Sequence, residues 1–243
     1  MPNTVKAKAD AEVKSTAGKP RTRGAHRTQR AQRAATAHTL KSMRDAAVAL
    51  IAKHGYHGVS LRTLADEVGI QAGSLYNHIT NKQELLFMLL HGNMSLLISE
   101  VTEYVQGAVG PIEKMQRFVE AHLRFHVQHP QEVFIGTMEL RSLEPEFHAQ
   151  ILAMRDDYSH MLEEIVKQGK KEHVFEVSDV RIATFAILGM LNNIATWYRP
   201  EGRLSVPKLM DIYQNMVFGM LGAKPDARRP RAKSAARATA SVD

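Results

Sequence analysis

The sequence predicts an all-α protein of about nine helices, and three observations support this fold class. Apolar residues recur at three- and four-residue steps through most of the 243-residue chain, which is the period of an amphipathic helix. Glycine and proline fall between these periodic segments, where helices begin or end. No segment alternates convincingly with a period of two, so we expect no strand. Cysteine is absent, which excludes disulfides, thiolate metal sites and cysteine nucleophiles.

The first four expected helices cover residues 40–82 and the segment that follows. An apolar face predicts the first helix, which ends at Gly55 and Gly58 and carries Leu40, Met43, Ala47, Leu50 and Ile51. Two short helices are expected at residues 61–68 and 72–79, separated by Gly69. Asn81 with Glu84 three residues later is typical of a helix N-terminus, so a longer fourth helix begins there.

Proline marks most of the later boundaries, at Pro111, Pro130, Pro145 and Pro207. The long helices expected after them cover residues 145–170, 178–198 and 207–222. The longest uncharged run, residues 182–198, is just shorter than a usual membrane span and is polar at one end. We therefore expect a buried helix there, no contact with a membrane, and a cytoplasmic protein.

Positive charge is concentrated at the two ends of the chain. Residues 1–35 contain nine Lys and Arg against two acids, and residues 223–243 contain six against two. Few large apolar side chains occur in either segment, so folding would not offset the chain entropy lost on ordering. We expect a disordered basic N-terminal extension at residues 1–35 and a disordered basic tail at 223–243. Such tails either aid solubility or attract DNA by displacing its counterions.

The middle of the chain divides near Lys82 into a basic head, residues 36–82, and an acidic body, residues 83–222. The head has five basic residues against three acidic, and the body has twelve against eighteen. This division suits a protein that places one end against a polyanion.

Residues 58–79 carry the most informative motif. Two short helices joined by a glycine turn match a helix-turn-helix, with a small core expected from Leu64, Val68, Ile70, Leu75 and Ile79. The second helix has short polar side chains and no carboxylate, as a helix that enters the major groove requires. The sequence therefore predicts a helix-turn-helix DNA-binding domain at residues 36–82.

This segment strongly resembles the DNA-binding head of the TetR (tetracycline repressor) family. The matching positions are Ser60, Arg62, Leu64, Ala65, Gly69, residues 75–79 (Leu-Tyr-Asn-His-Ile) and residues 81–86 (Asn-Lys-Gln-Glu-Leu-Leu). Two positions depart from the family pattern: Ile79 replaces an aromatic residue, and Gln71 stands where Ser often caps the recognition helix. The resemblance implies an all-α fold with a ligand-binding and dimerisation domain at residues 83–222.

The resemblance also implies roles in DNA binding. Arg62 would contact a base directly, since its guanidinium can pair with guanine O6 and N7. Base edges or thymine methyls would be met by Ala72, Ser74, Tyr76 and Asn77. Phosphates would be held by Ser60, Tyr76, His78 and Lys82, which sets the register without reading sequence.

In this family the last two long helices pair with their copies in a four-helix bundle. Two apolar stripes are consistent with a homodimer of this kind: Ile182, Phe185, Ala186, Gly189, Met190 and Asn193, then Leu209, Ile212, Tyr213, Met216, Val217 and Met220. The alternative is that these are ordinary core helices.

The resemblance implies a repressor that a small-molecule effector releases from a palindromic double-stranded DNA operator. Residues 154–158, 189–192, 197–199 and 202–204 resemble the subgroup that senses acyl-coenzyme A thioesters, and another small apolar or aromatic acid is the alternative. Candidate ligand-binding residues are His126, Met138, Arg141, Arg155, Tyr158, Asn193, Trp197 and Arg199.

Other classes of function have little support in the sequence. His122, His126 and His129 have the spacing of a metal site, but such residues are more often hydrogen-bonded members of a helix. We expect no metal and no cofactor. No Glu-x-x-His, Gly-x-Gly-x-x-Gly, Gly-x-Ser-x-Gly or His-Glu-x-x-His motif occurs, so we expect no enzyme. A sequence-tolerant architectural DNA-binding protein, bound through its basic tails, is the remaining alternative.

Overall fold

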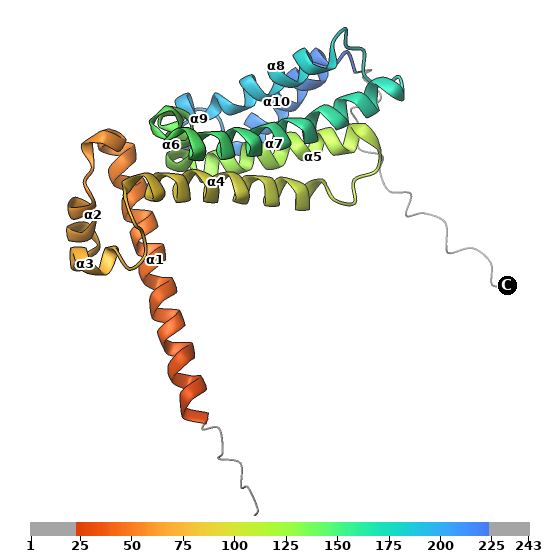
Figure 1. Ribbon diagram of the computed structural model, residues 1–243. Coiled ribbons are helices and arrows are strands. Elements are labelled where there is room, and N and C mark those ends of the chain that lie inside the picture. The colour runs from red at the N-terminus through yellow and green to blue at the C-terminus, as the bar shows by residue number, and fades with distance from the viewer. Residues whose placement is uncertain (1–22, 224–243) are drawn as a thin grey trace, which may run out of the picture. The chain divides into compact units, whose positions relative to one another are not determined.

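The computed structural model describes residues 23–223, with side chains from residue 38 onward. This range contains helices and turns and no strand (Figure 1), which confirms the all-α prediction. The chain falls into two compact units, one up to Lys41 and one from Ser42 onward. The first helix, α1 (Arg23–Gly58), contributes to both units. The head and the body described below lie in the second unit.

Helix α1 begins twelve residues before the expected end of the disordered extension at residue 35. The structure thus has helix at residues 23–35, where disorder was expected. These residues are mostly Ala, Arg, Gln and Thr, and Ala, Arg and Gln favour helix. Adding residues to an existing helix also avoids the cost of nucleation. Residues 1–22 and 224–243 lie outside the described range, and their predicted disorder stays a prediction.

The turn between the two short helices of the head forms as the motif predicts. Gly55 breaks the regular path of α1 at a φ of 73°. Ser60 then caps α2 (Leu61–Val68) by accepting a hydrogen bond from the Thr63 N–H, and Gly69 ends it in the left-handed conformation, φ 73°. Only glycine adopts that conformation without a steric cost.

The recognition helix α3 (Ala72–Leu75) is a single turn and not the two turns expected for residues 72–79. Residues 76–78 form a tighter turn, in which the His78 N–H donates to the Leu75 carbonyl at 2.9 Å. This path brings Ile79 into the core, where it is 1% exposed, just before the next helix begins. Leu64 and Leu75 are also fully buried in the head core, as expected.

Helix α4 (Lys82–Val105) begins with a reciprocal cap at Asn81. Asn81 Oδ1 accepts a hydrogen bond from the Glu84 N–H at 2.8 Å. Glu84 Oε2 in turn accepts from the N–H and the hydroxyl of Thr80, both at 2.6 Å. The expected N-terminus is thus correct. Within the described residues α4 alone is long and apolar enough to cross a membrane, but its leucines pack into two protein cores.

The body consists of the remaining helices and one short 3-10 helix. They are α5 (Gly110–Gln128), α6 (Pro130–Met138), η1 (Leu140–Ser142), α7 (Pro145–Lys171), α8 (Val180–Asn192), α9 (Ile194–Trp197) and α10 (Val206–Met220). The expected single helix at 178–198 is interrupted at Asn193, whose carbonyl and side chain both accept hydrogen bonds from the Thr196 hydroxyl. Such local side-chain bonds compete with helix continuation. This break divides the expected helix into α8 and α9, so the described residues contain one α-helix more than the nine or so expected.

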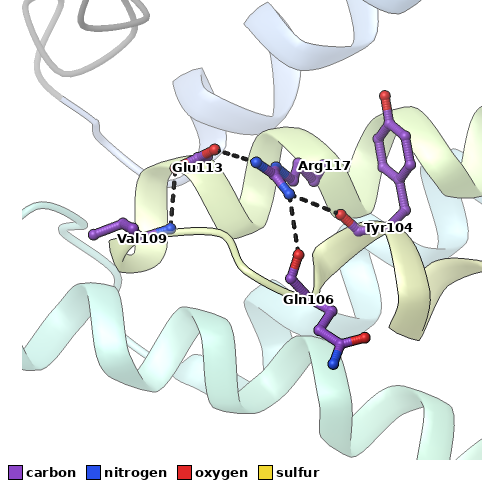
Figure 2. Close-up of polar contacts among 5 residues, drawn as sticks. All are labelled: Tyr104, Gln106, Val109, Glu113 and Arg117. Carbon is purple, nitrogen blue, oxygen red and sulfur yellow. Dashed lines mark hydrogen bonds and ion pairs between the residues drawn. The ribbon is translucent and has the colours of Figure 1, made fainter. Parts of the chain in front are cut away.

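The connection between α4 and α5 is held by one ion pair (Figure 2). Arg117 Nη1 donates to the carbonyls of Tyr104 and Gln106 at 3.3 and 3.1 Å, and Arg117 Nη2 pairs with Glu113 Oε1 at 2.6 Å. Glu113 Oε2 accepts from the Val109 N–H at 3.0 Å. The pair therefore satisfies the last carbonyls of α4 and an N–H at the start of α5.

Two histidines are buried in the body core. The rings of His122 and His126 stack with centroids 4.0 Å apart. His122 Nδ1 and the Tyr158 hydroxyl are hydrogen-bonded at 2.7 Å, and His126 Nδ1 donates to the His122 carbonyl at 2.9 Å. Burial lowers the pKa of both imidazoles, that of His126 to about 4. Both rings are therefore neutral near pH 7.

We expect His126 to make the protein less stable in mild acid. In the unfolded chain a histidine takes up a proton near pH 6.5, whereas folded His126 does so only near pH 4. As pH falls from about 7 to about 5 the unfolded state gains protons first, so His126 should cost about 2 kcal/mol of unfolding free energy. His126→Gln should lose less stability over this range in urea unfolding. Exposed His160→Gln is the control, and an equal acid loss in both variants would contradict the assignment.

Gly169 in α7 lies under the ring of Phe175, and a Cβ at this position would overlap that ring. Gly169→Ala should therefore destabilise the fold by about 1–3 kcal/mol through overpacking. Gly92→Ala is the matched control in α4, where a Cβ meets nothing within 4 Å and should stabilise the helix by about 0.5–1 kcal/mol. Chemical unfolding of both variants checks the pair. Equal effects would show that Phe175 moves aside freely.

Candidate DNA-binding surface and ligand cavity

The residues expected to bind DNA lie on and beside α2 and α3. Six of them are exposed: Ser60, Arg62, Ala72, Ser74, Tyr76 and Asn77. Tyr76 is 57% exposed, unusually open for an aromatic side chain. His78 is half-buried. The structure thus places these residues on the surface of one small helical unit.

No carboxylate occurs in α3 or in the turn after it, residues 72–78. Gln71 precedes α3 without a side-chain capping hydrogen bond, as its departure from the family pattern suggested. A surface of short, uncharged polar groups can approach phosphates and base edges without electrostatic repulsion. Thr63, exposed on α2 and hydrogen-bonded to the Ser60 hydroxyl at 2.8 Å, belongs to the same surface and was missed.

Lys82, which was expected to hold a phosphate, is half-buried and lies against the end of α1. Its Nζ lies 4.2 Å from the centre of the Tyr56 ring and 3.5 Å from the His57 carbonyl oxygen. Partial burial lowers the pKa of Lys82, while Glu139 acts in the opposite direction. Lys82 therefore also joins the end of α1 to the start of α4.

A cavity of about 220 Å³ lies in the body, lined by residues from five helices. Its lining is largely apolar. The polar side chains come from α4, α5, α6, α7 and α8: Asn93, His126, Thr137, Arg155, Tyr158 and Asn192. Of the expected ligand-binding residues, His126, Arg155 and Tyr158 are brought together here.

Arg155 is the cation of this cavity. Its Nη2 donates to the Gly136 carbonyl at 2.7 Å, and within residues 38–223 no carboxylate forms an ion pair with it. Burial lowers the pKa of the Arg155 guanidinium. A half-buried guanidinium that forms no ion pair has further N–H groups, which can donate to a carboxylate or carbonyl oxygen.

A second cavity of about 160 Å³ shares His126 with the first and is lined by Arg199. The other four expected ligand residues, Met138, Arg141, Asn193 and Trp197, line neither cavity. Sequence reasoning missed Asn93, Thr137 and Asn192. The sequence did offer a hint for Asn93, because this amide stands among the apolar residues of α4, and the structure buries it. In the described residues no cluster of three or more His, Asp or Glu side chains could hold a metal ion.

The cavity and the head are joined by hydrogen bonds at the end of α6. Gly136 and Thr137 line the cavity, and Glu139, which follows α6, accepts a hydrogen bond from the Tyr56 N–H at 3.0 Å. Gln83 in the first turn of α4 donates to the Ser142 carbonyl at 2.8 Å and accepts from the Glu144 N–H at 2.9 Å. A shift of α6 would therefore reach both α1 and α4.

Two family models match the chain. Residues 44–89 match the model described as bacterial regulatory proteins of the tetR family, and residues 108–221 match the tetracyclin repressor-like C-terminal domain. The transcriptional repressor KstR2 of Mycobacterium tuberculosis is 28% identical over 178 residues, 72% of this chain and 88% of that protein. The fatty acid metabolism regulator of Bacillus subtilis is 26% identical over 179 residues, 72% of this chain and 92% of its own.

A solved structure of AibR in complex with isovaleryl coenzyme A and operator DNA is similar in fold. It superposes with a TM-score of 0.70 at 28% identity and covers 76% of this chain and all of that chain. The two-domain helical fold, the recognition helix without carboxylates and the two family matches all indicate the same family. The chain belongs to the TetR family and is a DNA-binding transcriptional regulator.

Proposed function

We propose that the protein is a homodimeric cytoplasmic repressor that an acyl ligand, a coenzyme A thioester in the first instance, releases from a palindromic operator. The observation that carries this proposal is the contact path from the cavity through Glu139 to Tyr56. Occupancy of the cavity by a ligand would bias the position of α6, and α6 is bonded to the helices that hold the recognition surface.

Exposed apolar residues on the last long helices support the dimer. On α8, Ile182 and Phe185 are 65% and 50% exposed, and Ala186 and Gly189, which follow them, are small and exposed. On α10 the expected stripe divides: Met216 and Met220 are exposed, while Leu209, Tyr213 and Val217 pack into the body core. The outward half of the stripe is the part left to pair with a second copy.

The size of the cavity and its single cation support an acyl effector. A cavity of 150 Å³ accommodates benzene, so about 220 Å³ suits a short-chain or single-ring acyl group. Arg155 would receive the acyl oxygen. The AibR complex contains isovaleryl coenzyme A, whose acyl group is of this size. One cation also suits the carboxylate of a free apolar or aromatic acid, which is the second candidate effector.

Arg62 and Lys82 should differ in how they affect DNA binding. Arg62→Ala should cost about 1–3 kcal/mol at one base-pair position in each half-site, because a base contact is lost. Lys82→Ala should weaken binding to all sequences about equally. Fluorescence anisotropy with a duplex selected from a random pool, and its single-position variants, measures both. Because Lys82 contacts Tyr56, its loss could also destabilise the fold. Thermal unfolding of each variant measures this effect, and Lys82→Arg keeps the positive charge as a control. Equal losses across all duplexes for both variants would contradict these roles.

Arg155 should govern the response to effector. Isovaleryl coenzyme A should raise the unfolding temperature and release the selected duplex, and Arg155→Met should weaken this response about tenfold, or about 1.4 kcal/mol. Arg141→Met is the matched control, since Arg141 is exposed and lines neither cavity. Free isovalerate and coenzyme A alone complete the series. If free isovalerate releases the duplex and the thioester does not, the effector is a free acid. If only Arg141→Met loses the response, the effector site is not the cavity that Arg155 lines.

A further inference from the structure

Helix α1 extends well beyond the part of the chain that the family model matches. The match begins at residue 44, whereas α1 begins at Arg23. The preceding 21 positions of α1 lie outside that match. At 1.5 Å per residue, the segment from Arg23 to Lys41 is about 27 Å long.

The basic residues of this segment share one face of the helix. With 100° between successive residues, they fall within an arc of about 140°: Arg23, His26, Arg27, Arg30, Arg33, His38 and Lys41. No Asp or Glu occurs between Glu12 and Asp45. The segment thus has a stripe of basic positions, four of them arginines, and no acidic residue in its own sequence.

The rest of the helix surface narrows the choice of partner. Between Val13 and Leu40 the chain contains no large apolar residue, and the positions opposite the stripe are Ala, Thr and Gln. A lipid surface requires an apolar face on the bound helix, and a partner helix requires an apolar seam. Neither is present, so charge alone must hold the partner.

We propose that residues 23–41 are a second DNA-binding element, which holds the phosphates of duplex DNA without reading sequence. The proposal rests on the proposed operator binding of the head, which makes a DNA duplex the polyanion within reach of the same chain. Duplex DNA carries one negative charge per about 1.7 Å of axis, so a 27 Å stripe passes many phosphates. The head would select the site, and the arm would add affinity at every sequence.

The expected size of the effect follows from counterion release. Each phosphate neutralised contributes about −0.9 to the slope of log K against log salt concentration. Four arginines, at positions 23, 27, 30 and 33, therefore contribute about −3.6 for each protomer. A fourfold rise in salt concentration would then weaken the arm's contribution about 150-fold.

The test uses the full-length chain with Arg23, Arg27, Arg30 and Arg33 all changed to Gln. A matched variant changes the uncharged face, Thr28, Gln29, Gln32 and Thr36, to Ala. Dissociation constants for the selected duplex and for a random duplex are measured at several salt concentrations. We expect the arginine variant to lose about 3–4 from the slope for each bound protomer, or about 7 for the homodimer, on both duplexes. It should keep its base preference, while the matched variant behaves as the unmodified chain. An unchanged slope in the arginine variant overturns the proposal.

A second variant separates the helix from its charge. Ala31→Pro keeps every arginine but interrupts the helix, so it should lose part of the slope of log K against log salt concentration. If this variant keeps the full slope, the phosphate contacts do not require a helix, and that part of the proposal is overturned. The same measurements are repeated with a duplex RNA of the same sequence. If the arginine variant loses slope on the RNA but not on the DNA, the choice of DNA as the partner is overturned. Failure of the proposed function is distinguishable, because the unmodified chain would then show no preference for the selected duplex over the random one.

Discussion

Helix α4 is the constraint on which the rest of this protein depends, because two hydrophobic cores share it. Leu85, Leu86, Leu89 and Leu90 pack in the head core, and Leu97 and Val101 pack in the body core. Asn93, between these sets, lines the body cavity. Close-packed interiors transmit displacement because they contain few voids to absorb it. One continuous helix therefore positions the DNA-binding surface and one wall of the cavity together.

The second link between cavity and head is polar and is concentrated at the end of α6. Glu139 and Gln83 bond to backbone groups on the opposite side of this junction, and Lys82 lies against Tyr56 beside them. Hydrogen bonds of this kind have discrete geometries, so a modest displacement breaks them and does not merely stretch them.

The cavity carries polar groups that a purely structural core would avoid. Arg155 is half-buried and forms no ion pair with a carboxylate in the described residues, and Asn93 Oδ1 has no hydrogen-bond partner there. Each such group costs stability unless something satisfies it. The stacked pair of His122 and His126 remains inside by staying neutral. Stability given up at a binding site is the usual consequence of keeping that site ready for a ligand.

The sequence alone determined the head. Its glycine turn, its buried Leu64 and Leu75 and the cap at Asn81 follow from local periodicity and from hydrogen bonds between near neighbours. The single turn of α3, the break at Asn193 and the choice of Arg155 over Arg141 for the cavity were decided only by the tertiary structure. The cavity is assembled from five helices between Leu90 and Asn192, and no short-range pattern records which faces meet. Packing between residues distant in sequence selects those faces, because burial rewards the fold as a whole.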